Sequence, residues 1–122
     1  MEIKWLGTPT DSSFDAALSY LTLLFGNLEA KRLVKKLRKA SVEHFAAKDI
    51  LRAAQSQALP AEVEHVAVNL QKIKSEKEIE PVLLCRHNGH LIIADGIHRI
   101  SAAWHLEEDT PIHAIVASGK NS

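Results

Sequence analysis

The apolar residues of the first forty positions recur at the spacing of an α-helix. Between residues 14 and 25 they follow one another at intervals of three or four, and Gly26-Asn27 ends the pattern. A second run over residues 28–39 shows the same spacing, with Asn27 able to cap it. We therefore expect two helices that form a hairpin, the first of them capped from positions 10–13.

The middle of the chain carries shorter signals. Residues 42–45 predict a short strand, and residues 47–54 predict a short helix. Pro60 is typical of a first helical turn, and apolar positions continue at helical spacing as far as Ile73. We therefore expect a longer helix that opens at Leu59-Pro60.

The period changes in the last third of the chain. Residues 82–85 and 91–94 are apolar runs of β type, and the Asn88-Gly89 pair between them predicts a β-hairpin. Residues 97–106 then have the pattern of a helix, and residues 112–116 that of a final strand.

Composition agrees with one folded domain. The chain has 122 residues, of which 46% are hydrophobic, and its 15 basic and 15 acidic residues balance. The element order predicts a single α+β domain, with a helical N-terminal extension over residues 1–40 and a core over residues 41–117. The one cysteine, Cys85, excludes an intrachain disulfide and a multi-thiolate zinc site. With no secretory signal and no apolar run of membrane length, we expect a cytoplasmic protein without a membrane partner.

The segment from Asp95 to Arg99 joins a tight glycine turn to the start of a helix. N–H groups at a helix start favour an anion, and Gly96 allows close approach to the backbone. His98 and Arg99 add donors in a first turn that normally carries acidic residues, so a negative group should compensate them. Two interpretations remain open: a bound phosphate, or an ion pair of Arg99 with Asp95 or a distant glutamate.

The order of motifs around this turn resembles the ParB/sulfiredoxin superfamily. Asp95-Gly96-Ile97-His98-Arg99 is followed by Ala102-Ala103 and by Pro111 before an apolar strand, and the likeness covers residues 42–117. The resemblance implies the small fold of that superfamily, a nucleotide such as ATP or CTP with Mg²⁺, and a link to DNA. It also implies that the phosphates contact Gly96, Ile97, His98 and Arg99.

Departures from the superfamily narrow the expected activity. Ile97 occupies the position of the sulfiredoxin catalytic cysteine, so sulfinic acid reduction is not expected. The family's preceding helix carries a lysine and hydroxyl residues at the nucleotide, and the matching positions here are Glu62, His65 and Asn69. Since few residues follow position 117, we expect a stand-alone bacterial module without the helix-turn-helix domain of ParB proteins.

Three functions are therefore open. The first is binding of a nucleotide or another phosphate ligand, with or without hydrolysis, and the second is a metal-dependent nuclease. The third is a non-catalytic protein-interaction module that keeps the pocket as structure. Asp95 and His98 are the candidate catalytic residues, and with one evident carboxylate at the turn the sequence indicates no metal site.

The predicted second helix is strongly basic. Its cations could neutralise several phosphates and give salt-sensitive, sequence-independent binding to nucleic acid. The alternative is a solvated face whose charges meet Glu43, Asp49 or an acidic partner. The six cations are Lys31, Arg32, Lys35, Lys36, Arg38 and Lys39.

The other histidines and the cysteine have structural interpretations. His87 and His90 flank the predicted hairpin turn and are expected to be exposed. His105 is expected at a helix end, and Cys85 is expected to be an inert core residue.

Overall fold

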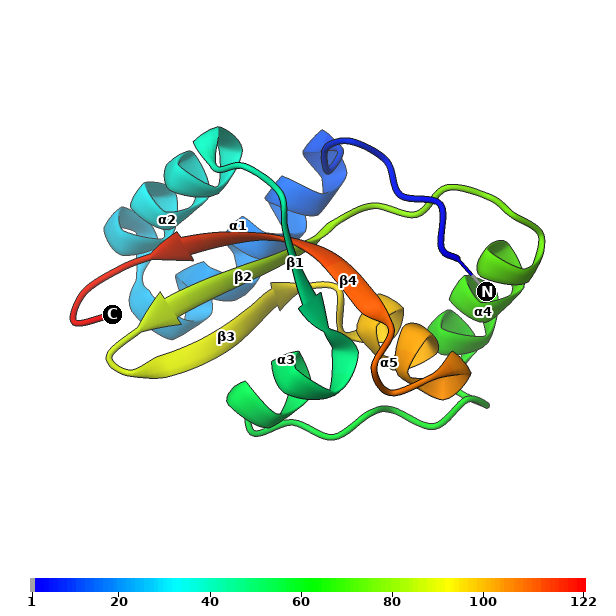
Figure 1. The fold of residues 1–122 in the computed structure, drawn as a ribbon. Coiled ribbons are helices and arrows are strands. Elements are labelled where there is room, and N and C mark those ends of the chain that lie inside the picture. Colours follow the sequence, from blue (N-terminus) through cyan, green and yellow to red (C-terminus); the bar gives the residue numbers. More distant parts are fainter. Residues whose placement is uncertain (1) are drawn as a thin grey trace.

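A computed structural model describes residues 2–122 as a four-stranded mixed sheet with helices on both faces (Figure 1). The predicted α+β class is confirmed. The helices are α1 (Asp11–Phe25), α2 (Asn27–Lys39), α3 (Ala47–Ala53), α4 (Glu64–Lys74) and α5 (Ile97–Leu106). The strands are β1 (Glu43–Ala46), β2 (Val82–His87), β3 (His90–Asp95) and β4 (Pro111–Ser118).

The strands lie in the order β1-β4-β2-β3. β2 and β3 form the predicted antiparallel hairpin, and Asn88 (φ 51°) and Gly89 (φ 76°) both have the positive φ of a type I′ turn. β2 pairs in parallel with β4, which pairs antiparallel with β1. β1 and β3 are therefore the edges of the sheet.

The predicted helical hairpin is confirmed, and it covers one face of the sheet. Leu21 of α1 and Leu33 of α2 are buried in one cluster with Leu83 and Cys85 of β2. Because side chains alternate along a strand, the neighbouring residues of β2 point to the opposite face. Helices α1 and α2 thus cover one of the two faces of the sheet.

The other face of the sheet packs against α3 and α5. Ile50 and Ile100 are buried there with Val82 and Leu84, the alternate residues of β2. α4 lies outside α5, against which it buries Val66. None of the helices in residues 2–122 combines the length and apolar character that a bilayer crossing requires.

The first helix begins at Asp11 with Thr10 as its N-cap residue, within the predicted capping positions 10–13. The predicted start of the longer middle helix was wrong. α4 begins at Glu64, four residues after Pro60, because Pro60 instead opens a turn closed by the Val63 N–H on its carbonyl (3.2 Å). The Leu59 N–H donates to Oγ of Ser101 (3.0 Å), which fixes this segment outside the helix.

Candidate functional site

Gly96 joins β3 directly to α5. Its φ of 119° lies in the region that L side chains rarely adopt, and a β-carbon here would lie 2.5 Å from Cγ1 of Val82. Backbone conformation and packing therefore both require glycine. The Ile100 N–H makes the first helical bond to the Gly96 carbonyl (3.0 Å), so the preceding N–H groups of α5 have no carbonyl one turn back.

Arg99 is held by two acceptors at this turn. Its Nη2 donates to Oδ2 of Asp95 at 2.7 Å, and its Nη1 donates to the backbone carbonyl of Glu80 at 3.3 Å. The Arg99 side chain is 11% exposed and the Asp95 side chain 25%, so water screens this ion pair only partly. The predicted ion pair with Asp95 is present.

Glu80 anchors the start of α1 to the segment before β2. Its Oε1 accepts hydrogen bonds from the Thr10 N–H (2.7 Å), the Thr10 hydroxyl (2.8 Å) and the Ser13 hydroxyl (2.7 Å). Burial acts to raise the pKa of Glu80, but these bonds and the charge of Arg99 outweigh it and lower the pKa below its ordinary value. Oε1 of this carboxylate is therefore already engaged by three donors of the protein.

His98 lies in the first turn of α5 against His65 of α4. The two rings meet edge to face, with centroids 5.2 Å apart. Burial, His65 and Arg99 lower the pKa of His98, while Asp95 acts in the opposite direction. His98 is therefore biased toward the neutral form, and a nearby anion would oppose that bias.

A cleft of about 540 Å³ opens where α1, α4 and α5 meet. It exposes donors from all three helices and also contains the carboxylates of Glu78, Glu80 and Asp95. The side chains in the cleft that can donate are Ser12, Ser13, His65, Asn69, Lys72, His98 and Arg99.

Lys72 is a cleft residue that the sequence analysis missed. His65, Asn69 and Lys72 are spaced i, i+4 and i+7, which places them on one face of α4. This helical spacing is the sequence feature that could have placed Lys72 beside His65 and Asn69. Glu62, the position matched to the lysine of the superfamily, precedes α4 and does not line the cleft. The cation that α4 contributes to the cleft is instead Lys72, one helical turn after Asn69.

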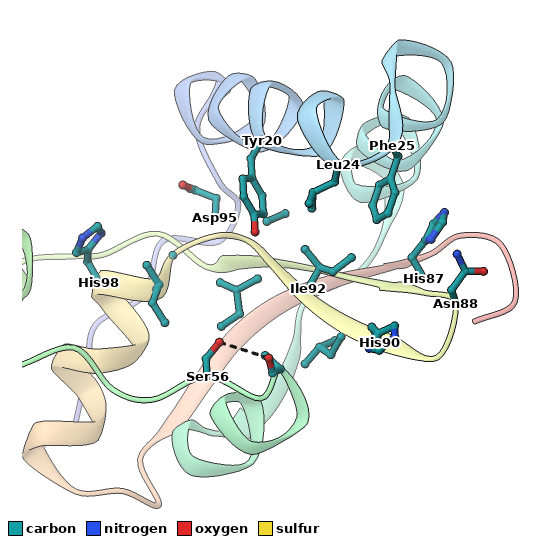
Figure 2. Close-up of a pocket in the computed structure, with 16 residues that line it drawn as sticks. Tyr20, Leu24, Phe25, Ser56, His87, Asn88, His90, Ile92, Asp95 and His98 are labelled. Carbon is teal, nitrogen blue, oxygen red and sulfur yellow. Dashed lines mark hydrogen bonds between the residues drawn. The ribbon is translucent and has the colours of Figure 1, made fainter.

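A second cleft of about 660 Å³ follows β3 and meets the first at Asp95, Gly96 and His98. Tyr20 and Leu24 of α1 form one wall, and Ser56, after α3, lies opposite (Figure 2). This second cleft is more apolar than the first, and Ile97 lies in it rather than among the donors.

The six cations of α2 divide into two groups. Nζ of Lys36 donates to the Ser118 carbonyl (2.7 Å), and Arg38 pairs with Asp11 (3.0 Å) while lying 4.4 Å from the Phe14 ring centroid. Glu43 and Asp49, the expected acidic neighbours, pair with none of the six in residues 2–122. The cations left without an ion pair or side-chain hydrogen bond there are Lys31, Arg32, Lys35 and Lys39.

The expectation of an exposed His87 was wrong. His87 is 6% exposed, and its ring stacks on Phe25 with centroids 3.9 Å apart. The α1–α2 hairpin covers this end of β2, which the turn sequence alone could not indicate. His105 lies at the end of α5 as expected, where its Nε2 donates to the Leu59 carbonyl (2.7 Å).

Cys85 is fully buried in β2, which confirms the core interpretation. Burial raises the pKa of its thiol to about 12, so the thiolate required for nucleophilic or redox chemistry is disfavoured. Across residues 2–122, no three side chains of the His, Cys, Asp and Glu types gather as metal ligands would.

No protein-family model, curated protein or solved structure matches this chain.

Proposed function

We propose that this protein binds a phosphate-bearing ligand, such as ATP or CTP, in the cleft between α1, α4 and α5. The observation that carries the proposal is the convergence of His65, His98 and Arg99 at the amino end of α5. The Arg99 guanidinium opposes the helix dipole at this end, and a phosphate would compensate both the cation and the dipole. The resemblance of the Asp95–Arg99 motif to the ParB/sulfiredoxin superfamily supports the same ligand class.

The arrangement of carboxylates favours binding over hydrolysis. Asp95 is bound to Arg99, and Oε1 of Glu80 is bound to Thr10 and Ser13. Among the cleft carboxylates of residues 2–122 this leaves Glu78 without a hydrogen bond or ion pair, and one free carboxylate is too few for a dedicated Mg²⁺ site. A Mg²⁺ ion accompanying a nucleotide would depend on the phosphates for most of its ligands. We therefore propose a binding module rather than a nuclease.

A thermal-shift series with inorganic phosphate, ATP and CTP, each with and without Mg²⁺, tests this proposal. A ligand that binds the folded state raises Tm. We expect that rise in the wild-type protein and in Lys74→Ala, a control on the same helix outside the cleft. His98→Gln and Lys72→Ala should reduce it. Equal responses of the two lysine variants, or no response to any ligand, would contradict the proposal.

The bonds of Arg99 favour a second candidate, a protein-interaction module in which the motif only supports the fold. Both of its observed acceptors belong to the protein. In that case Arg99→Ala would lower Tm in plain buffer, and no phosphate ligand would raise the Tm of the wild type. The same series therefore separates the two functions.

A contact between α2 and nucleic acid is the second part of the proposal. Leu28, Arg32, Lys35 and Lys39 share the face of α2 opposite its buried stripe, and that face presents three cations in a row. Each phosphate neutralised on duplex DNA contributes about −0.9 to the slope of log K against log salt. The double variant Lys35→Ala/Lys39→Ala loses two of these cations. Its slope of log K against log salt, measured by fluorescence anisotropy, should be shallower by about 2. Lys74→Ala with Lys77→Ala should leave it unchanged, and an unchanged slope in the α2 double variant would contradict the contact.

A further inference from the structure

Strand β3 is an edge strand whose outward backbone groups can be identified from its register. It pairs only with β2, and His87 and His90 flank the two-residue turn. In such a hairpin the pair beside the turn is hydrogen-bonded, and the following pairs alternate. Leu91 and Ile93 then occupy non-hydrogen-bonded positions, so their N–H and C=O groups point away from β2.

Those outward groups have no backbone partner in residues 2–122. They lie along the cleft of about 660 Å³, which follows the free edge of β3. Figure 2 shows α1 on one side of this edge and the end of α3 on the other. The cleft is therefore a groove with a row of unpaired peptide groups along its floor.

Residues 91–93 of the edge lack the usual protection against strand addition. Proteins normally blunt an exposed edge with lysine, proline or a bulge. Residues 91–93 of β3 are Leu, Ile and Ile, and the register shift opposite Leu83 and Leu84 makes Ala94 the extra residue of a bulge on β3, at the Asp95 end beyond this stretch. Tyr20 and Leu24 are each 46% exposed beside this edge, which leaves apolar surface available to an added strand.

The shape of the groove favours a single strand over a second copy of this chain. Walls rise on both sides of the β3 edge, so the surface is concave and does not complement itself across a two-fold axis. An isolated extended segment needs no such self-complementarity. Its backbone would reach the outward groups of Leu91 and Ile93, and its side chains would alternate between the two walls.

The charges of the groove define the kind of segment. Asp95 is the only carboxylate in the lining, and it is already paired with Arg99 at 2.7 Å. The other polar lining side chains are hydroxyl, amide and imidazole groups. A segment with charged side chains would lose hydration here without gaining a partner, so uncharged side chains are the electrostatic match.

We propose that an extended peptide segment with uncharged side chains binds as an added strand on β3, in the groove between α1 and the end of α3. This site goes beyond the phosphate cleft. It depends on Leu91, Ile93, Tyr20 and Leu24, none of which lines that cleft. Failure of one proposal therefore leaves the other standing.

The test uses a fluorescein-labelled peptide of alternating threonine and valine, capped at both ends. We expect saturable binding to the full chain in fluorescence anisotropy. On binding, the Leu91 and Ile93 amides should become protected from hydrogen exchange, whereas the Ile92 amide, already in the ladder, should change little. Two further peptides carry an N-methyl group on every second residue, one on the odd and one on the even positions. The peptide whose methyl groups replace the N–H groups facing the β3 edge should bind about tenfold more weakly.

A matched pair of variants locates the site. Leu24→Lys puts a charge into the groove wall, whereas Leu23→Lys puts one on the same helix at a position that is 87% exposed and outside the groove. We expect only Leu24→Lys to abolish binding. Three results would overturn the proposal: no saturable binding, equal binding of all N-methylated peptides, or protection of the edge amides that depends on protein concentration without peptide. The last result would assign the edge to a second copy.

Discussion

The carboxylate of Glu29 lies 3.0 Å from Nε2 of His87, which connects α2 to the end of β2. His87 donates from Nε2 to this carboxylate, and its Nδ1 is buried without a partner in residues 2–122. A β-carbon at Gly119 would lie 2.8 Å from Cδ2 of His87, so the chain after β4 packs closely over the ring. The first forty residues and the sheet thus share a buried polar contact.

We expect Glu29→Ala to lower the free energy of unfolding by about 1–3 kcal/mol, because it leaves Nε2 of a buried imidazole unpaired. Glu29→Gln keeps an oxygen acceptor and should lose less. Urea denaturation measures both variants, with Glu43→Ala on the exposed edge of β1 as control. A loss in Glu29→Ala no larger than in Glu43→Ala would show that the contact does not stabilise the fold.

Gly96→Ala should destabilise the protein by about 1–3 kcal/mol or more, because the positive φ strains an alanine and the new methyl group would overlap Val82. Gly7→Ala is the matched control, since no atom outside the adjacent residues lies within 4 Å of a β-carbon there. Chemical denaturation measures the free energy of unfolding of both variants, and the two values can be compared directly if the m-values are equal. Similar stabilities of the two variants would mean that the turn can relax.

Stability should fall in acid through Glu80. Its pKa is lowered in the folded state, so below the ordinary value of 4.5 the unfolded chain takes up a proton first. The stabilisation is present above that pH and is lost as the pH falls through the folded-state pKa. Glu80→Gln should therefore flatten the fall in unfolding free energy over this acid range, relative to Glu62→Gln. A parallel pH profile in the two variants would refute the role of the Thr10 and Ser13 bonds.

His98 should titrate below its ordinary pKa of 6.5 in the ligand-free protein and shift upward when inorganic phosphate is added. Burial and the nearby charges of His65 and Arg99 disfavour the imidazolium, and a bound anion reverses that effect. NMR titration of the His98 Cε1 proton measures the shift, and His65→Gln should raise the pKa of His98 without phosphate. An unchanged titration at saturating phosphate would place the anion elsewhere.

Local patterns in the sequence were sufficient for most elements of the fold. The Asn88-Gly89 pair predicted the hairpin because a type I′ turn needs positive φ at both positions. The helix over residues 97–106 followed from its apolar spacing after a glycine turn. The start of α4 was missed because Pro60 suits a turn as well as a helix, and the bond from Leu59 to Ser101 joins positions far apart in the chain.

The sequence by itself determined the α+β class, the hairpin and the motif from Asp95 to Arg99, because these depend on residues close together along the chain. Only the tertiary structure brought Lys72 into the cleft, buried His87 beneath the α1–α2 hairpin and left the edge of β3 open between two helices. Each of these depends on how distant elements pack against the sheet. Contacts between distant elements depend on the shape and chemistry of entire helix and sheet faces, and a local sequence pattern does not contain that information.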